Sequence, residues 1–540
     1  MKILLLIILV IIGNSLFAQA TNWDWAKKSG ALGAEYGHTI DKDGEGNVYV
    51  AGVYNGSFIA FGTDTLLNSY GYGMYLVKYD VSGNIQWARG IDSVYNSLTD
   101  YFMDIAIDMS GNIYFAGSYI TPSLIKYDSA GNVLWSRDND GLNFSIDIDA
   151  SNNVYVAGSF RAPVTFGNYT LHNSDTVANP QLYDIFIVKY DELGNVLWAK
   201  SEGSLGQEEF ACIKIDDNGN IFLSGRYGYS ETITFGTYTL TNSDSNNTYY
   251  GYDVFIVKYD NNGNILWAKG EGAIGYNSGE RINGLATDSQ GNIYAIGQFN
   301  TPSITFDSTT LLNVDDQASG TSYDAFIVKY DPQGTLIWVI SIGDNGMELG
   351  DDIITDAYDN IYITGIYSNS ITFGETTLPN NNFGATKIFV AKYDLDGNVL
   401  WANYSGGTCY AWTGEIAADD IGNVYVTGFF SVNSIIFGSD TLYDDTGRDM
   451  FLAKLNSNNL TVATEKINDI NDYLIYPNPS NGIFNIKTIG HLETIEIYNS
   501  MGELLFITKN SNQINLQNYP EGLYLARINR KEKCYKLISK

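Results

Sequence analysis

The feature that most constrains this fold is a unit of four strand-like stretches that recurs along the chain. The most regular stretch reads GNVYVAG or a close variant, and its copies end at Gly52, Gly117, Gly158, Gly225, Gly297, Gly365 and Gly428. A second stretch reads FIVKYD, and a third reads NVLWAK. The tryptophans of the third stretch are Trp25, Trp87, Trp135, Trp198, Trp267, Trp338 and Trp401. Apolar and polar residues alternate in each stretch, and Gly, Asn or Asp lie at its ends, which is typical of β-strands.

Each of these three stretches occurs seven times, and a weaker strand precedes GNVYVAG, as in IKID at 213–216. Four strands in each of seven units predict an all-β protein with a seven-bladed β-propeller over residues 21–460. The abundance of Gly (55 residues) and Tyr (41 residues) agrees with a fold of strands joined by tight turns.

The order of the strands predicts how the ring closes. A tryptophan strand at 23–28 comes before any GNVYVAG stretch, and the last unit ends at FLAKLN (451–456) without a tryptophan strand after it. We therefore expect the strand at 23–28 to complete the seventh blade. This closure would remove two exposed strand edges that otherwise favour aggregation.

The seven tryptophans need no catalytic role. Blades of a propeller pack face to face, and a large flat side chain at one repeated position fills such an interface. We expect all seven to be blade-packing residues.

Six units contain an insert between the second and third strands, such as ITFGTYTLTN at 233–242, and the second unit lacks it. The inserts share one position in the unit, so we expect them to emerge from the same region of each blade. Tyr, Thr and Asn in them suit contacts with protein or carbohydrate. The alternative is that they only extend the rim of the blades.

Units that pair GN-[IV]-Y-[VA]-[AT]-G with [FI]-[IV]-[VA]-K-Y-D resemble the seven-bladed β-propeller repeats (SBBP-like) of secreted bacterial proteins. The resemblance covers residues 22–456. It implies a fold but no particular activity, because propellers occur in enzymes, binding proteins and scaffolds.

The N-terminus has the pattern of a secretory signal peptide over residues 1–20. Lys2 precedes an apolar run, ILLLIILVII, and a small-residue site, Ala18-Gln19-Ala20, follows. Cleavage is expected after Ala20, with Ala18 as the alternative. No second apolar run is long enough to span a bilayer, so no transmembrane segment is expected in the mature chain.

The repeats stop near residue 460, and the polar segment 461–472 is expected to be a linker. The pattern of apolar stretches and turn residues over 473–540 predicts a small Ig-like β-sandwich. Its turns are expected at YPNPSNG (476–482), Gly502 and Gly522. This region resembles the C-terminal sorting domain of the type IX secretion system of Bacteroidota. The residues that carry the resemblance are Tyr476, Pro477, Asn478, Pro479, Gly482, Gly502 and Gly522. It implies export through the periplasm to the cell surface or the medium, with the secretion machinery as a partner.

The formal net charge of −31 lies almost entirely in the predicted propeller, because residues 464–540 carry 9 Lys or Arg and 8 Asp or Glu. Such a surface repels nucleic acid and anionic lipid. The charge suits basic partners or divalent cations, although it also serves solubility alone.

No catalytic constellation emerges from the sequence. The three histidines, His38, His172 and His491, are far apart, and no zinc-protease, nucleophile-elbow or phosphate-loop pattern occurs. Cys212, Cys409 and Cys534 have neither disulfide nor zinc spacing and are expected to be small buried residues.

The pattern D-x-x-G-N looks like the start of a calcium loop, and DKDGEGN at 41–47 is the best candidate. The pattern occurs thirteen times, always between two predicted strands, and Asp149 and Asp356 begin copies in which Asn or Asp replaces Gly. A hairpin turn in which Asp accepts backbone N–H bonds and the fourth residue takes a positive φ explains every copy. We therefore expect turns and no cofactor, with calcium as the alternative.

These observations predict an exported, non-catalytic propeller for adhesion or ligand binding, whose ligand is an unidentified protein or glycan. The alternative is a secreted polysaccharide hydrolase or lyase with carboxylates at the channel mouth. Ligand identity, oligomeric state, and release or surface anchoring stay open.

Overall fold

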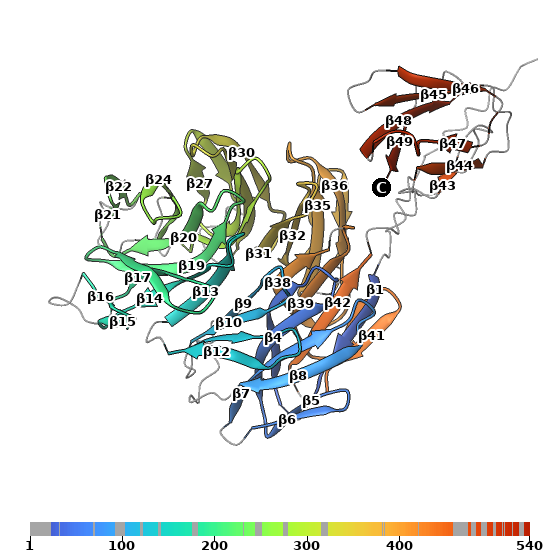
Figure 1. The fold of residues 1–540 in the computed structure, drawn as a ribbon. Helices are drawn as coiled ribbons and strands as arrows, with labels where there is room; N and C mark the ends of the chain where they lie inside the picture. The colour runs from blue at the N-terminus through green and yellow to red at the C-terminus, as the bar shows by residue number, and fades with distance from the viewer. Residues whose placement is uncertain are drawn as a thin grey trace, which may run out of the picture. The chain divides into compact units, whose positions relative to one another are not determined.

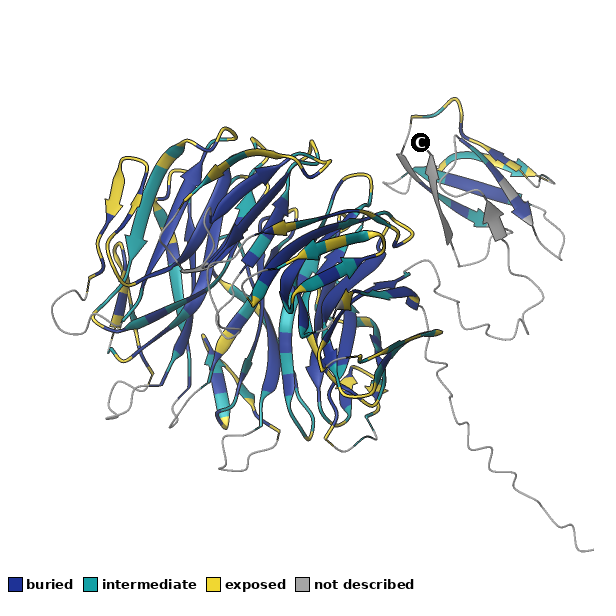
Figure 2. Ribbon diagram, turned by 90° about the horizontal axis from the view of Figure 1, so that it is seen from below, coloured by how far each residue is buried: buried dark blue, intermediate teal, exposed yellow. Residues whose placement is uncertain are grey.

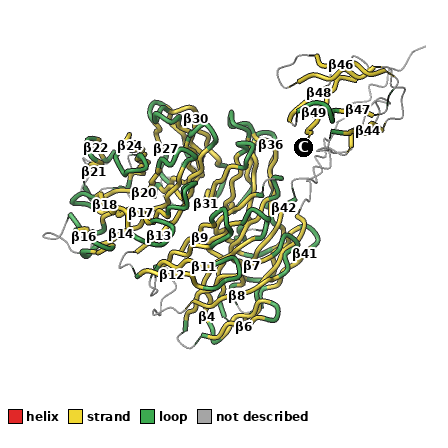
Figure 3. The backbone as a smooth tube through the Cα atoms, in the orientation of Figure 1, coloured by secondary structure: helices red, strands yellow, loops and turns green. Residues whose placement is uncertain are grey.

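The computed structural model describes residues 23–456 and 474–539 apart from short segments, the longest being 92–102, 175–181, 244–250, 315–321 and 488–493. The chain forms two compact units that divide near residue 460. The first unit consists of seven four-stranded antiparallel sheets (Figure 1), which confirms the predicted seven-bladed propeller. The described residues contain strands and loops without helices (Figure 3). The predictions for residues 1–20 and for the linker lie outside the described residues.

The strands of each blade follow one another from the channel to the rim. Blade 1 contains β3 (Glu35–Lys42), β4 (Val48–Asn55), β7 (Tyr72–Tyr79) and β8 (Ile85–Ile91). Blade 2 contains β9 (Met103–Ile107), β10 (Ile113–Gly117), β11 (Leu124–Tyr127) and β12 (Val133–Arg137). Blade 3 contains β13 (Leu142–Ile148), β14 (Val154–Phe160), β17 (Asp184–Tyr190) and β18 (Val196–Glu202). Blade 4 contains β19 (Gln207–Ile215), β20 (Ile221–Gly228), β23 (Asp253–Tyr259) and β24 (Ile265–Glu271).

Blade 5 contains β25 (Arg281–Thr287), β26 (Ile293–Phe299), β29 (Asp324–Tyr330) and β30 (Leu336–Ile342). Blade 6 contains β31 (Glu348–Thr355), β32 (Ile361–Tyr367), β35 (Lys387–Tyr393) and β36 (Val399–Tyr404). Blade 7 combines β38 (Tyr410–Ala418), β39 (Val424–Ser431) and β42 (Asp449–Leu455) with β1 (Trp23–Lys28). The innermost strand of each blade lies beside those of its two neighbours, so these strands surround a closed central channel.

The predicted closure of the ring is confirmed. Strand β1 pairs antiparallel with β42, with Ala26 opposite Ala453 and Lys28 opposite Phe451. Trp23 and Trp25 are buried there. The two ends of the propeller chain therefore share one sheet, and the outer edge of β42 is covered.

The core of the unit lies between the blades, as the dark blue middle strands in Figure 2 show. The GNVYVAG strands are buried on both faces, because each blade packs on a neighbour on either side. Their tyrosines, such as Tyr49 and Tyr294, are fully buried and donate a hydrogen bond to the aspartate that begins the preceding turn.

The six inserts form β-hairpins on the rim. They are β5 (Phe58–Phe61) with β6 (Asp64–Leu67), β15 (Val164–Phe166) with β16 (Tyr169–Leu171), β21 (Thr232–Phe235) with β22 (Tyr238–Thr241), β27 (Ser303–Phe306) with β28 (Thr309–Leu312), β33 (Ile371–Phe373) with β34 (Thr376–Leu378), and β40 (Ser434–Phe437) with β41 (Asp440–Tyr443). The short strands β2 (Gly30–Ala31) and β37 (Gly406–Gly407) extend two of them. The second strand of each hairpin lies against the outermost strand of its blade. In blade 4, the buried Phe235 ring packs 5.1 Å from Phe255. The inserts therefore cover the outer edge of the blades, which favours the rim interpretation.

The D-x-x-G-N segments are hairpin turns with one common hydrogen-bond pattern. In the copy at Asp260, the carboxylate accepts N–H bonds from Asn262 and Asn264 at 2.9 and 2.8 Å, and the Asn264 amide donates to its other oxygen. The fourth residue has a positive φ in every copy, including Asn152 (58°) and Asp359 (61°). These thirteen turns are therefore structural, as the sequence predicts.

The same turn occurs at two depths, which predicts unequal effects for one substitution. Asp288 is 4% exposed, accepts the Tyr294 hydroxyl at 2.8 Å and lies 3.5 Å from the Lys329 ammonium. Asp288→Ala should lower the free energy of unfolding by about 3–5 kcal/mol, because it leaves a buried ammonium without its carboxylate. Asp260→Ala, in the exposed copy, should cost only about 1–2 kcal/mol. Urea unfolding of both variants tests this; equal losses would contradict it.

The second unit has two small antiparallel sheets. One contains β43 (Leu474–Tyr476), β44 (Ile483–Lys487) and β47 (Gln513–Asn515). The other contains β45 (Thr494–Asn499), β46 (Leu504–Lys509), β48 (Gly522–Ile528) and β49 (Cys534–Ser539). Phe484 and Ile514 from the first sheet pack with Ile495 and Ile497 from the second, as in a β-sandwich. In the part of the chain that the structure describes, no helix has the length and apolar composition to cross a bilayer.

Candidate functional site

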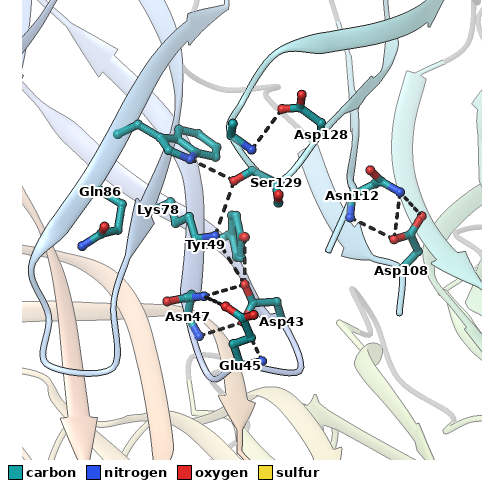
Figure 4. A network of polar contacts seen from close by, with 12 residues as sticks. Asp43, Glu45, Asn47, Tyr49, Lys78, Gln86, Asp108, Asn112, Asp128 and Ser129 are labelled. Atoms are coloured by element: carbon teal, nitrogen blue, oxygen red, sulfur yellow. Dashed lines mark hydrogen bonds and ion pairs between the residues drawn. The ribbon is translucent and has the colours of Figure 1, made fainter. Parts of the chain in front are cut away.

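The repeated tryptophans lie at the junctions between blades. Trp87 and Lys78 of blade 1 both donate to the carbonyl oxygen of Ser129 in a turn of blade 2, at 3.2 and 3.4 Å. Figure 4 shows this turn beside the Asp43 turn, whose carboxylate lies 3.5 Å from the same Lys78 ammonium. The tryptophans with the equivalent bond are Trp135, Trp267 and Trp338. Each therefore joins its own blade to the next one.

The turn glycine makes room for this tryptophan. A Cβ atom built on Gly131 would lie 3.2 Å from the Trp87 ring, and one on Gly334 would lie 3.0 Å from the Trp267 ring. Trp25 closes the ring in the same way, because a Cβ on Gly83 of blade 1 would lie 3.0 Å from its ring. Glycine is thus favoured for two reasons. Its turn has a positive φ, and a side chain there would clash with the tryptophan of the neighbouring blade. Trp198 contacts Tyr155 within blade 3, and Trp401 contacts Tyr362 within blade 6.

The central channel contains a cavity of about 300 Å³ lined by all seven innermost strands. Five carboxyl groups face it, from Asp41, Asp104, Asp147, Asp352 and Glu415, together with the Lys214 ammonium. The structure therefore brings together acidic side chains that are far apart in the sequence. They belong to different blades and to two positions of the innermost strand. By register, Asp104 and Asp352 lie opposite the residue just before the GNVYVAG glycine. Asp41 and Asp147 lie opposite the tyrosine three residues before that glycine.

Four of these carboxylates bridge two strands in the same way. Asp104 accepts the N–H of Ile105 on its own strand at 2.7 Å and the N–H of Ile146 on the next blade at 3.0 Å. Asp41, Asp147 and Asp352 accept equivalent pairs of N–H groups. Glu415 accepts the N–H of Ile40 at 3.2 Å, and so links blade 7 to blade 1. Backbone groups thus occupy these oxygens, and the carboxylates hold the inner ring together.

Burial sets the charge of this channel. It raises the pKa of Asp41 and of Asp352 to about 7, and it raises the pKa of Glu415 well above its usual range. The nearby Asp147 carboxylate, 3.2 Å from the ammonium, raises the pKa of Lys214 to about 12. The backbone N–H bonds oppose the effect of burial on the two aspartates.

One side of the channel mouth carries an arginine pocket of about 230 Å³, lined by Glu209, Arg226, Arg281 and Asn283 among others. Arg226 donates to Glu209 at 2.9 Å and lies over the Tyr252 ring at 4.2 Å. Arg281 is exposed beside them. The two cations and one carboxylate give this pocket a net positive charge in an otherwise acidic chain.

The mouth residues of blades 1 and 7 are aromatic. By register, Tyr36 and Trp412 occupy the positions that Glu209 and Arg281 occupy in blades 4 and 5. Trp412 is 38% exposed and stacks on Phe429, with ring centroids 5.9 Å apart and an interplanar angle of 8°. Tyr36 is buried, whereas Trp412 is an exposed and rigidly held ring of the kind that is common on ligand-binding surfaces.

The remaining candidate residues offer no second site. Burial lowers the pKa of His38 to about 4, and this ring stacks on Tyr36 near the mouth. His172 is exposed on the rim, and His491 lies outside the described residues. Cys212 and Cys409 are free thiols whose pKa burial raises to about 12.

The calcium candidate at 41–47 is one of the buried turns. Its Asp43 oxygens accept bonds from Glu45, Asn47 and Tyr49. Within the described residues, no group of three or more His, Cys, Asp or Glu side chains has an arrangement suited to a metal ion.

The described sorting residues lie at strand ends or turns. Tyr476 ends β43, Gly522 begins β48, and Gly482 has a φ of 85° with its carbonyl oxygen bonded to the Leu516 N–H. A Cβ on Gly482 would lie 2.9 Å from the backbone nitrogen of Gln517, so only glycine fits this turn. Pro477, Asn478, Pro479 and Gly502 lie outside the described residues.

Neither the channel carboxylates nor the arginine pocket was predicted from the sequence. The available signal was the weak innermost strand: aligning its seven copies on the following GNVYVAG glycine puts Asp104 and Asp352 at one position. No repeated pattern predicts the arginine pocket, because no other blade has an arginine at the position of Arg226 or at the position of Arg281.

Comparisons with known proteins identify the C-terminal unit. Residues 474–540 match the family model described as a secretion system C-terminal sorting domain. The chain therefore carries a type IX sorting domain on a β-propeller, which implies a secreted or surface location and an interaction with the secretion machinery.

The propeller has a distant relative. Over an alignment of 538 residues the chain is 26% identical to the "Uncharacterized WD repeat-containing protein L264" of Acanthamoeba polyphaga mimivirus, covering 80% of this chain and 38% of the relative. The chain thus spans well under half the length of that protein.

Two solved structures give weaker similarities. A protein of unknown function from Dyadobacter fermentans is 10% identical, with 79% of this chain and 98% of that chain covered and a TM-score of 0.37. XC5397 from Xanthomonas campestris, described as a gluconolactonase, is 12% identical, with 71% and 90% covered and a TM-score of 0.32.

Proposed function

We propose that this protein is an exported, non-catalytic binding or adhesion module whose ligand docks at the channel mouth. The exposed Trp412 of blade 7 and the arginine pocket of blades 4 and 5 form the binding surface. Stacking on Trp412 suits a sugar ring or an aromatic side chain, and Arg281 suits a carboxylate. Protein and glycan ligands that carry acidic groups share this chemistry.

One observation carries the non-catalytic assignment. The carboxylates of the channel accept backbone N–H groups of two neighbouring blades, as Asp104 does from Ile105 and Ile146. A general acid or base must reach a proton of the substrate. Carboxylates that already accept N–H groups from two neighbouring blades stabilise the ring instead.

The repeats support membership of the SBBP-like propellers of secreted Bacteroidota proteins, and the sorting domain supports delivery by the type IX pathway. In this proposal the sorting domain is removed after export. The propeller then acts at the outer-membrane cell surface or in the medium.

The second candidate is a polysaccharide hydrolase or lyase that works at the same mouth. The observation in its favour is that five carboxyl groups share one cavity, and the pKa of two of them is about 7. Such a pKa suits general acid–base catalysis near neutral pH.

A binding screen with a parallel depolymerisation assay separates the two functions. We expect residues 21–540 to retain an acidic ligand on a glycan array or a surface-protein panel without shortening any polysaccharide. Arg281→Ala and Trp412→Ala should each weaken binding at least about tenfold, as for central interface residues. Arg161→Ala and Tyr443→Ala, which change exposed residues outside the arginine pocket and outside the aromatic residues of blades 1 and 7, are the matched controls. Depolymerisation that Asp352→Asn abolishes would refute the proposal.

A further inference from the structure

Four junctions between blades contain a buried glutamate from one blade and a buried aspartate from the previous blade. All eight side chains are at most 2% exposed. The pairs are Glu35 with Asp449, Glu208 with Asp184, Glu280 with Asp253, and Glu348 with Asp324. Their glutamates lie at or next to the first residue of the innermost strands, apart from the channel carboxylates.

The backbone places the two members of each pair together. The N–H of Glu208 donates to the carbonyl of Tyr183, directly before Asp184, and the N–H of Glu348 donates to the carbonyl of Tyr323, directly before Asp324. Glu35 bonds in the same way to Arg448, directly before Asp449. In the fourth pair, Gly279 bridges to Tyr252, so the residues that follow them, Glu280 and Asp253, come together.

The connecting loops touch both carboxyl groups of a pair. Ser204 donates its N–H and its hydroxyl to Glu208, at 3.2 and 2.5 Å. A Cβ built on the adjacent Gly203 would lie 2.4 Å from an oxygen of Asp184. At the junction of blades 5 and 6, Asp344 donates its N–H to Glu348, and a Cβ on Gly343 would lie 2.2 Å from Asp324.

At the five junctions whose residues the structure describes on both sides, the two acids occur together or are both absent. At the junction of blades 6 and 7, register puts Lys387 at the aspartate position and Ala411 at the glutamate position. Thr386 there exchanges hydrogen bonds with the backbone of Ala411 instead. A single buried acid would be an unpaired charge, whereas a pair can neutralise itself by holding one proton.

We propose that each of these four pairs shares one proton, with the glutamic acid O–H donating to the aspartate carboxylate, and that these bonds hold neighbouring blades together until alkaline pH removes the protons. The shared proton replaces the water that both groups lose on burial. Two ionised carboxylates in the same space would repel each other in a medium of low polarity.

The charged surroundings agree with this at the closing junction. Burial, followed by the Asp449 charge, raises the pKa of Glu35 to about 9, against the opposing effect of Lys28. Lys28 itself contacts Asp445 at 2.5 Å and Asp449 at 3.3 Å. At the other junctions, the Tyr227 hydroxyl lies near Asp253 and near Glu271, and Asp344 faces Glu348.

The direction of the pH dependence follows from the raised pKa. A glutamate that is protonated in the folded state and ionised in the unfolded chain stabilises the fold fully below its unfolded pKa of about 4.3. That contribution falls as pH rises, and it is exhausted above the folded pKa. The ring should therefore be most stable in mild acid and should weaken between about pH 5 and pH 9.

The test compares residues 21–540 with a variant that carries Glu35→Gln, Glu208→Gln, Glu280→Gln and Glu348→Gln. Glutamine keeps the donor but cannot ionise. Between pH 5.5 and pH 9 the melting temperature of the parent should fall on the order of 10 °C further than that of the variant. Glu375→Gln, in an exposed rim hairpin, is the control and should follow the parent. Channel acids such as Asp41 are present in all three proteins, so the difference isolates the pairs.

Infrared spectra at pH 8 provide a readout that does not depend on stability. The parent should show the C=O band of protonated carboxyl groups, and this band should weaken in single variants such as Glu208→Gln. Parallel melting profiles for parent and variant, or an unchanged band, would overturn the proposal. Millimolar calcium that raises the melting temperature of the parent at pH 9, but not that of the glutamine variant, would also overturn it, because the pairs would then hold a cation.

Discussion

A protein that lacks residues 21–30 should lose at least about 10 °C in melting temperature or fail to fold, because this deletion removes the strand that closes the ring. The deletion exposes the pocket of two buried tryptophans, Trp23 and Trp25. Each large aromatic removed from a core costs about 3–5 kcal/mol, against a total stability of about 5–15 kcal/mol. It also frees the edge of β42, so dimers or aggregates should appear on size exclusion.

A single variant of the same strand, Lys27→Ser, is the matched control. Lys27 is half-buried, and the tryptophans stay in place. This variant should melt within a few degrees of the parent. Adding a peptide of residues 21–30 to the truncated protein should restore part of the lost stability. A truncated protein with an unchanged melting temperature would show that β1 does not close the ring.

Removal of residues 464–540 should stop the propeller in the periplasm of a host with a type IX system. The reason is that the matched sorting domain, residues 474–540, lies wholly within the deleted segment. Fractionation followed by protease treatment of intact cells measures the outcome. The full chain should reach the surface or the medium, and the truncated chain should stay protected by the outer membrane.

Two controls make this result specific. The truncated propeller should keep the melting temperature of the parent propeller, since a misfolded protein would also fail to leave the cell. Residues 464–540 fused to an unrelated periplasmic protein should carry that protein to the surface. Surface exposure of the truncated propeller would refute the sorting role.

The sequence predicted what depends on local patterns. The turn at Asp260 follows from its own five residues, because Asp260 and Gly263 satisfy the turn within the segment. The closure of the ring follows from counting strands. The strand at Trp25 precedes the first complete unit, and the last unit lacks a tryptophan strand, so the two belong to one blade. Repetition made both inferences secure.

The sequence did not predict what depends on contacts between blades. Asp104 and Asp352 occupy the same position in their blades, opposite the residue just before the GNVYVAG glycine. That shared position does not show which face of the innermost strand lines the channel, because this depends on how the blades surround it. The direction of the inserts was ambiguous for a similar reason, since a common position in the repeat does not say whether a hairpin turns toward the mouth or the rim.

The closure of blade 7 also sets an order of events for the folding chain. Strand β1 begins at Trp23 and its partner β42 ends at Leu455, so the first strand made must wait for almost the whole propeller. Contacts between such distant segments form slowly, because a long loop must close before any bond is gained. If the leader is cut after Ala20, the waiting strand starts at the third residue of the exported chain. A chain exported in this way would cross the inner membrane before its ring closes.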